Sequence, residues 1–358
     1  MRFEIWDARD ARDRARWRAA HEALPTREVY ADPAYVGLFA GEGEEPLAAY
    51  AETGSGSVLY PFILRPIAAP RLDSGRCDIT SAYGYAGAFC SAPPDDPDAK
   101  EFWAAFDGFC RDRRVVSEFT RLSLFDDERL AYPGRVEPRL VNVVCDLRVP
   151  EDEAWRGYEH KVRKNVNRAL RGGVTIEVDE TGARLDDFLR IYAGTMDRRG
   201  AAASFYFPRG FFETIIREMP GRYAFFHALH SGRVVSTELV LASADTLYSY
   251  LGGTEQDAFD LRPNDLLKVE VCRWGRGRAM KRFVLGGGHG PDDGIFRYKR
   301  AFAPDGLVPY AVGTRVLDER GYARLCEAHR AEGLRRDPGW APDPGFFPGY
   351  RCALPDVQ

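Results

Sequence analysis

The sequence of 358 residues lacks the marks of several large protein classes. It has no run of about 18 apolar residues, so we expect no transmembrane helix. The N-terminal stretch MRFEIWDARDARDRARWR is charged and contains no apolar segment, which argues against a secretory signal. None of the seven cysteines forms a C-x-x-C pair and their number is odd, so a zinc ribbon and a disulfide framework are both disfavoured.

Histidine and lysine are scarce, and the usual nucleotide-binding motifs are missing. The six histidines include one close pair, His227 and His230, without a third ligand nearby in sequence, so we predict no metal site. Walker A, G-x-G-x-x-G and G-x-S-x-G patterns are missing, which gives no support to nucleotide-binding or serine hydrolase chemistry. The net charge of −4 argues against a protein that coats nucleic acid generally. Only six of the 50 basic residues are lysines, so each lysine merits attention.

What is present fits a folded α/β protein of two domains. Apolar residues make up 45% and charged residues 29%, which is enough for a sizeable core. The expected elements of the first half are helices at 8–22, 32–39 and 98–113 and strands at 47–52, 57–64, 115–125 and 139–147. Pro150 and the acidic residues after it indicate a boundary. We therefore predict domains at 1–148 and 149–334, and a Pro- and Gly-rich tail at 335–358 that wraps the surface.

The second half begins with a basic helix. Apolar residues on one face predict this helix over 155–171. The elements expected after it are strand 174–178, helices 184–198 and 208–219, strands 222–229, 233–242 and 246–251, helix 263–279 and strand 282–285. This order favours an acyltransferase layout over a doubly wound dinucleotide-binding sheet. The basic side chains of the helix, Lys161, Arg163, Lys164 and Arg168, could bind RNA or nucleotide phosphates, with a solvated helix face as the alternative.

The strongest local signal is LGGGHGPDDGIFRYKRAF, residues 285–302. Three glycines after an apolar strand allow the backbone to approach a ligand closely. Lys299 follows next to Tyr298, and a fixed cation in such a place can stabilise a developing oxyanion. The alternative is a surface strand with solvated charges. His289 and Asp292 are candidates for the group that takes a proton, and a substrate-assisted route is equally open.

Two pairs of tyrosines allow either a pocket or ordinary packing. Tyr83 and Tyr85 lie in the glycine-flexible run SAYGYAG, residues 81–87. Tyr248 and Tyr250 lie on one face of a predicted strand.

Taken in order, the motifs resemble those of the FemABX-type aminoacyltransferases, which belong to the wider GNAT-like acyltransferase group. The matching segments are D-x-T-S-x-Y-G-Y-x-G-like residues 78–87, KVRKNVNRALRGGV at 161–174, Thr195 with Arg198 and Gly200, Tyr206, YSYLGG at 248–253, PNDLLKVEVCRWGRGRAMKRFVLGGG at 263–288, and the F-x-x-K-R-x-F-like end around Lys299. The resemblance covers roughly residues 30–315 as an ordered series, which is more specific than any single motif.

The resemblance implies an α/β fold of two tandem GNAT-like domains with mixed, largely antiparallel sheets. It implies transfer of an aminoacyl group from aminoacyl-tRNA to an amine on a peptidoglycan precursor or peptide metabolite, in the cytoplasm and without cofactor or metal. Lys299 then matches the family lysine that stabilises the transferring carbonyl, and Arg198 matches a position that could hold phosphate or carboxylate. The remaining expected substrate contacts are Tyr83, Tyr85, Tyr206, Tyr248, Tyr250, Gly287, Gly288, His289 and Tyr298. The long charged coiled-coil arm of some members is missing, which is compatible with a monomer.

Two other classes remain as alternatives. One is a GNAT-like enzyme that uses acyl-CoA or a carrier-protein thioester. Such enzymes carry [QR]-x-x-G-x-[GA] before a helix, and the one clean match, from Arg336 to Ala341, lies in the Pro-rich tail. The other alternative is a binding module that keeps the fold without the chemistry.

Overall fold

The computed structural model describes residues 1–67, 75–92, 96–290 and 292–356, which form two compact units. The first unit contains residues 1–139 and 311–358, and the second contains residues 140–310. The expected division at 148 and 334 differs from these ranges. Residues 311–334 group with the first unit because strand β13 (Leu307–Val316) pairs with β6 (Val115–Arg121), and helix α10 (Glu319–Arg336) also contacts β6.

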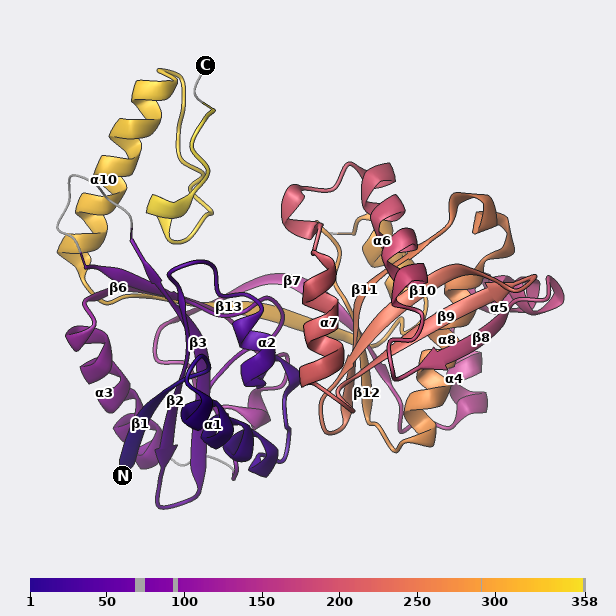
Figure 1. Cartoon of the computed structure of the whole chain (residues 1–358), viewed down its shortest axis with the longest axis horizontal. Helices are drawn as coiled ribbons and strands as arrows, with labels where there is room; N and C mark the ends of the chain where they lie inside the picture. The colour runs from indigo at the N-terminus through magenta and orange to yellow at the C-terminus, as the bar shows by residue number, and fades with distance from the viewer. Residues whose placement is uncertain (68–74, 93–95, 291, 357–358) are drawn as a thin grey trace. The chain divides into compact units, whose positions relative to one another are not determined.

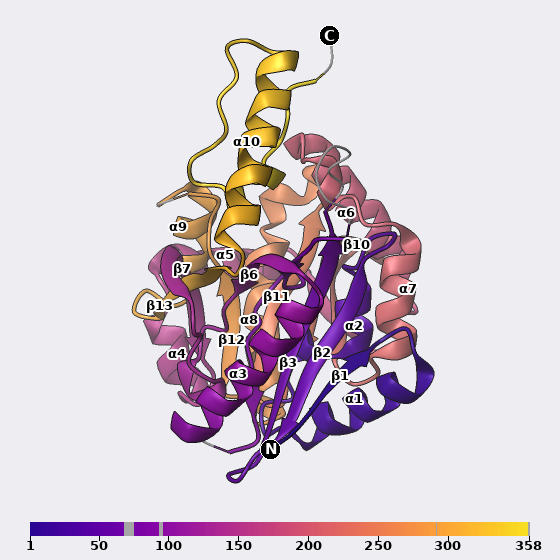
Figure 2. The same cartoon turned by 90° about the vertical axis from the view of Figure 1, so that its left-hand side faces the viewer.

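The first unit is a sheet with helices on both faces (Figures 1 and 2). Its strand order is β1-β2-β3-β4-β6-β13, and β5 pairs with β3. The elements not yet given are β1 (Arg2–Asp7), α1 (Ala11–Ala23), α2 (Pro33–Gly37), β2 (Glu45–Glu52), β3 (Ser57–Pro66), β4 (Cys77–Thr80), β5 (Phe89–Cys90) and α3 (Asp96–Asp112). Helix α3 buries Phe102, Trp103 and Phe106 against the apolar face of β3.

The C-terminal segment of the first unit is anchored through a buried aspartate. After α10 the chain runs back alongside that helix (Figure 1). There the hydroxyl of Tyr350 donates a hydrogen bond to Asp78 over 3.1 Å, and Arg351 donates to the same carboxylate over 2.6 Å. Asp78 itself is fully buried. Charge pairing and hydrogen bonding therefore hold a segment that has little regular structure of its own.

The second unit is also a sheet between two helical layers. Its strand order is β7-β12-β11-β10-β9-β8. The elements are β7 (Arg135–Asp146), α4 (Glu151–Gly157), α5 (His160–Arg171), β8 (Thr175–Asp179), α6 (Leu185–Arg199), α7 (Arg209–Glu218), β9 (Tyr223–His230), β10 (Arg233–Ala242), β11 (Thr246–Thr254), α8 (Pro263–Gly277), β12 (Arg282–Gly286) and α9 (Gly294–Arg300). Helices α5 and α8 pack together on one face, and α6 packs on the other against β10 and β11 (Figure 1).

The helix predicted over 155–171 is two helices. Tyr158 has extended backbone angles and separates α4 from α5. Its ring is buried against Phe302, and the amide of Glu159 donates to the carbonyl of Ala301 over 2.9 Å. Periodicity predicted the buried face correctly, since Val162, Val166 and Ala169 are buried. It could not predict the break, because the break is stabilised by contacts with residues far along the chain.

Each unit contains one parallel strand pair within an otherwise antiparallel sheet. In the described residues, β4 pairs with β6 in parallel in the first unit, and β11 pairs with β12 in parallel in the second. In both units a helix, α3 or α8, connects the two parallel strands. The repeat of this strand-helix-strand unit confirms the predicted tandem arrangement and the largely antiparallel sheets.

Candidate functional site

The candidate site lies where β11 and β12 of the second unit part. Their parallel pairing runs from Thr246 and Arg282 to Tyr248 and Val284. Beyond this point β11 continues along β10, while Gly286 of β12 pairs with β7. The end of β12 therefore follows β7 and no longer pairs with β11.

Asp293 shapes the loop that leads from β12 to α9. Its carboxylate accepts hydrogen bonds from the amides of His289, Gly290 and Phe296, over 2.6, 3.2 and 2.7 Å. The last of these caps the first turn of α9. A side chain at Gly288 would collide with the Asp293 carboxylate. The amide bonds hold the pKa of Asp293 below its usual value, so the loop is clamped by a charged carboxylate.

Lys299 of α9 points back at this loop. Its Nζ donates to the carbonyl oxygen of Gly287 over 2.7 Å. The side chain is half-buried, and burial together with the neighbouring Lys268 ammonium lowers the pKa of Lys299 to about 8. Gly286 has a φ of +80°, and a Cβ at that residue would lie 3.2 Å from Nζ. Helix α9 replaces the surface strand that was the sequence alternative, and Lys299 is fixed against the glycine loop.

A buried ion pair next to Lys299 was missed by the sequence analysis. Lys268 of α8 bonds to the Glu238 carboxylate of β10, and it donates to the hydroxyl of Ser249 on β11 over 2.7 Å. Glu238 and Lys268 are both buried, and the second carboxylate oxygen of Glu238 has no hydrogen-bond partner in the described residues. A lysine inside the apolar run LLKVEV of an arginine-rich chain was the signal that could have identified it.

More polar side chains gather around the first turn of α8. Asn264 donates to the Tyr298 hydroxyl over 2.9 Å, and Asn165 donates to the Asp265 carboxylate over 3.1 Å. Burial raises the pKa of both Tyr298 and Asp265. Tyr298, predicted as a substrate contact, therefore lies beside Lys299 with a partner of its own. Gly287, Gly288 and His289 belong to the same loop and complete the predicted group that the structure brings together.

The predicted residues on α6 and β11 lie elsewhere in the second unit. Tyr248 and Tyr250 alternate with Ser249 and so face away from α8, and Tyr248 is almost fully buried. Arg198 at the end of α6 donates to the carbonyls of Gly194 and Thr254 over 2.8 and 2.5 Å. The exposed Tyr206 donates to the Asp197 carboxylate over 2.9 Å. These side chains are engaged by their own chain on the α6 side of the sheet.

The basic side chains of α5 divide into two groups. Arg163 turns back to the joint with α4 and donates to backbone carbonyls, including that of Arg156 over 2.8 Å. Lys161, Lys164 and Arg168 lie on the exposed face, where Arg171 continues the row. In the part of the chain that the structure describes, Lys164 and Arg171 have no acidic partner. The exposed row therefore holds cations that are free to meet an anion.

Tyr83 and Tyr85 belong to the first unit. Tyr83 is exposed, while the ring of Tyr85 packs edge-on to Tyr30 at 5.4 Å between centroids. The carbonyl of Tyr83 accepts a 2.7 Å hydrogen bond from the Tyr35 hydroxyl. The loop is thus part of an aromatic cluster with Tyr30 and Tyr35.

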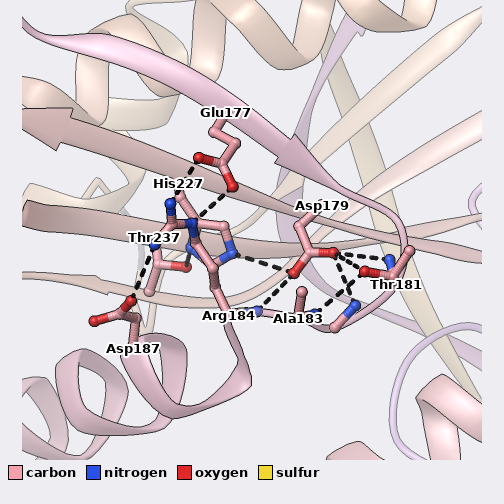
Figure 3. Close-up of polar contacts among 9 residues, drawn as sticks. Glu177, Asp179, Thr181, Ala183, Arg184, Asp187, His227 and Thr237 are labelled. Carbon is pink, nitrogen blue, oxygen red and sulfur yellow. Dashed lines mark hydrogen bonds and ion pairs between the residues drawn. The ribbon is translucent and has the colours of Figure 1, made fainter. Parts of the chain in front are cut away.

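A second polar cluster in the second unit contains a carboxylate, an imidazole and a hydroxyl in the sequence of contacts found in a catalytic triad, but these side chains are buried (Figure 3). The His227 Nδ1 lies 3.0 Å from the Thr237 hydroxyl, and its Nε2 lies 3.9 Å from the Asp179 carboxylate. All three side chains are buried. Asp179 also accepts the amides of Thr181 and Arg184, over 2.8 and 2.9 Å. Because no substrate can reach His227, we assign this cluster to holding the β8–α6 turn.

Two absences within the described residues concern metals and membranes. Across these ranges, no three His, Cys, Asp or Glu side chains come together as a metal site. No described helix is both long enough and apolar enough to cross a bilayer.

A known sequence family matches part of the unit that holds this site. The model of the acetyltransferase (GNAT) domain family matches residues 156–300, which include Glu238, Lys268 and Lys299. A curated relative, UDP-N-acetylmuramoylpentapeptide-lysine N(6)-alanyltransferase of Weissella viridescens, is 25% identical over 200 residues. The match covers 54% of this chain, and the chain spans only 57% of the length of that relative.

Comparisons with solved structures support the fold of most of the chain. The crystal structure of FemX matches with a TM-score of 0.68 at 12% identity, and covers 90% of this chain and 99% of that one. A conserved protein of unknown function from Bacteroides thetaiotaomicron matches with a TM-score of 0.56 at 9% identity, and covers 83% of this chain and 96% of that one. At such low identities these structures speak for the tandem fold alone.

Proposed function

We propose that this chain is a FemABX-type, GNAT-like N-acyltransferase that uses aminoacyl-tRNA as donor. Its acceptor is an amine on a peptidoglycan precursor or a peptide natural product. The name of the Weissella viridescens relative, an alanyltransferase that acts on the lysine of a muramoyl pentapeptide, supports this acceptor class. The observation that carries the proposal is the Lys299 ammonium held 2.7 Å from the Gly287 carbonyl oxygen at the parting of β11 and β12.

In this reaction the acceptor amine attacks the ester carbonyl of the donor. A C–N bond forms, the carbonyl oxygen gains negative charge, and the ester C–O bond then breaks to release the tRNA ribose hydroxyl. Lys299 stabilises the oxyanion with a charge that is already in place and half-desolvated, which makes it more effective than a cation in water. The amine proton passes to a base and from there to the departing ribose oxygen. His289, Asp292 and a substrate-assisted route are the candidates for this transfer.

The exposed row on α5 fits an RNA donor. Lys161, Lys164, Arg168 and Arg171 recur every three or four residues along one helix face, over a rise of about 15 Å. Successive phosphates of a nucleic-acid backbone present a row of negative charges to such a face. We propose that this row contacts the aminoacylated end of the tRNA. Arg198 and Tyr206 are proposed to contact the substrate that carries the acceptor amine.

The entry to α8 fits a pyrophosphate poorly. CoA-dependent GNAT enzymes hold that group on backbone amides at a helix start. Here Pro263 occupies the first helical position and lacks an N–H, and the buried Asp265 places a carboxylate in the first turn. The segment from Arg336 to Ala341, which matches the CoA pattern, follows the C-terminal end of α10, where carbonyls rather than amides are exposed. Both features favour aminoacyl-tRNA over acyl-CoA.

The experiment that tests the donor class is product analysis by mass spectrometry. The protein is incubated with a muramoyl pentapeptide acceptor and charged tRNA, with and without ribonuclease, and in parallel with acyl-CoA. We expect an amide product that disappears after ribonuclease treatment. A product that resists ribonuclease, or that forms from acyl-CoA alone, contradicts the proposal.

Because charged tRNA is a cytoplasmic substrate, we propose that the protein acts in the cytoplasm. Light scattering will test the proposal that it is a monomer.

A further inference from the structure

Two lysines from helices α8 and α9 bond to groups on or next to three neighbouring strands of the sheet. Strand β12 ends at the loop whose Gly287 carbonyl accepts from Lys299. The next strand, β11, carries Ser249, and the one after it, β10, carries Glu238. Lys268 reaches down from α8 to both of these, and its Nζ also lies 5.8 Å from the centre of the Phe283 ring on β12.

Neither carboxylate near Lys299 is bonded to it. Asp293 is engaged by three backbone amides, and the buried Glu238 bonds to Lys268. Burial makes an ammonium without a carboxylate partner costly. Glu238 bonds to Lys268 through one oxygen and leaves the other oxygen buried without a partner in the described residues. Lys299 bonds instead to a neutral carbonyl. Lys268 thus occupies the one buried carboxylate of this group.

We propose that Glu238 and Lys268 are a positioning pair, which keeps the Lys299 ammonium directed at Gly287 and sets the pH range in which it acts. This inference rests on the proposed transfer reaction. The pair makes no bond to the reacting atoms. Lys268 repels the Lys299 ammonium, and by bonding to Glu238 it prevents Lys299 from bonding to that carboxylate. Glu238 in turn stabilises the buried ammonium of Lys268.

Charged groups from three elements act on Lys299. Lys268 of α8 lowers its pKa, and Glu238 of β10 and Asp293 at the start of α9 raise it. Asp293 is engaged by three backbone amides, so its charge is set by the loop. The neighbouring Tyr298 is half-buried, and desolvation raises its pKa, so it stays neutral in the working range. The two members of the pair are therefore the groups whose removal changes the charge on Lys299 without unfolding the loop.

The test compares pH profiles of kcat for four variants. In Lys268→Met the Glu238 carboxylate is released to capture Lys299, so the alkaline limb of kcat moves up by about 1 pH unit or more while kcat itself falls roughly tenfold. In Glu238→Gln the limb moves down by a similar amount. Lys268→Arg keeps the charge and restores the wild-type limb. Lys281→Met, which removes a lysine paired with Asp245 at 2.9 Å, is the matched control and leaves the profile unchanged.

A second readout does not depend on activity. The chain has only six lysines, so selective isotope labelling of lysine gives six side-chain signals that can be titrated by NMR. We expect the Lys299 signal to titrate near pH 8, later in Lys268→Met and earlier in Glu238→Gln. Ser249→Ala removes one hydrogen bond from Lys268 and should shift the Lys299 signal in the same direction as Lys268→Met. This variant tests the inference if Lys268→Met and Glu238→Gln do not fold.

The outcomes separate this inference from the proposed function. If no donor supports transfer but the Lys299 titration shifts as expected, the proposed reaction is wrong and the pair stands. If transfer occurs and both the kcat limb and the NMR titration are the same in Lys268→Met, Glu238→Gln and wild type, the pair is structural and the inference is overturned.

Discussion

The replacement of Lys299 by methionine should separate activity from stability. Methionine keeps an unbranched side chain of similar length but carries no charge. The lowering of the Lys299 pKa from 10.5 to about 8 means that the charged form costs up to about 3 kcal/mol at neutral pH in the folded protein. Solvent contact of the half-buried side chain reduces this value. Loss of the hydrogen bond to Gly287 offsets about 1 kcal/mol.

We therefore expect Lys299→Met to be more stable than wild type by about 1–2 kcal/mol at pH 7, and slower in transfer by about 10²–10³-fold. The stability gain depends on pH with a definite sign. The unfolded chain binds the Lys299 proton more tightly, so the penalty in wild type is complete below about pH 8 and disappears as the pH rises through 10.5. The two proteins should become equally stable near the upper limit, apart from the missing hydrogen bond.

The assays are urea unfolding at pH 7 and pH 10 and transfer from radiolabelled aminoacyl-tRNA. Lys281→Met serves as the control in both, because that lysine lies in a surface ion pair away from the site. Turnover at the wild-type rate would refute the catalytic role of Lys299. A variant less stable than wild type at pH 7 would refute the argument that its buried charge carries a cost.

Three other predictions follow from the same geometry. Charge reversal of Lys164 or Arg168 should weaken tRNA binding in a filter-binding assay. The slope of log K against log salt should fall by about 0.7–0.9 for each phosphate that is no longer neutralised. Lys100→Glu in the first unit is the control and should leave that slope unchanged. Burial lowers the pKa of His227 despite the nearby Asp179. The neutral imidazole therefore contributes fully to stability above pH 6.5, and this contribution declines as the pH falls. In His227→Asn the melting temperature should fall less steeply between pH 6.5 and acid pH. Asp293→Ala should raise hydrogen exchange over residues 287–300 and slow transfer, with Asp293→Asn intermediate; unchanged exchange would contradict the clamp.

The regular elements were largely readable from local patterns. The apolar stripe of α5, the apolar runs of β2 and β3, and the glycine-ended β12 are patterns that each segment carries by itself. The break at Tyr158 and the helix α9 were not readable in this way. The first depends on the Phe302 ring, and the second on the Asp293 cap within a glycine-rich loop.

The candidate site shows the same division. Lys299 was predicted because it stands in a motif with its glycines, and the loop brings Gly287 to it over a short stretch of chain. Glu238 and Lys268 were not predicted, because each is a single charged residue in an apolar segment and neither has a partner nearby in sequence. Their ion pair spans 30 residues and forms only when α8 packs across β10 and β11.

By itself, the sequence determined which side chains are apolar enough to build two sheets, and it placed one lysine beside a glycine loop. Only the tertiary structure decided that this lysine shares its surroundings with a second lysine and a buried carboxylate. The physical reason is that hydrophobic patterning acts along a segment, whereas the charge state of a buried amine depends on every group packed around it.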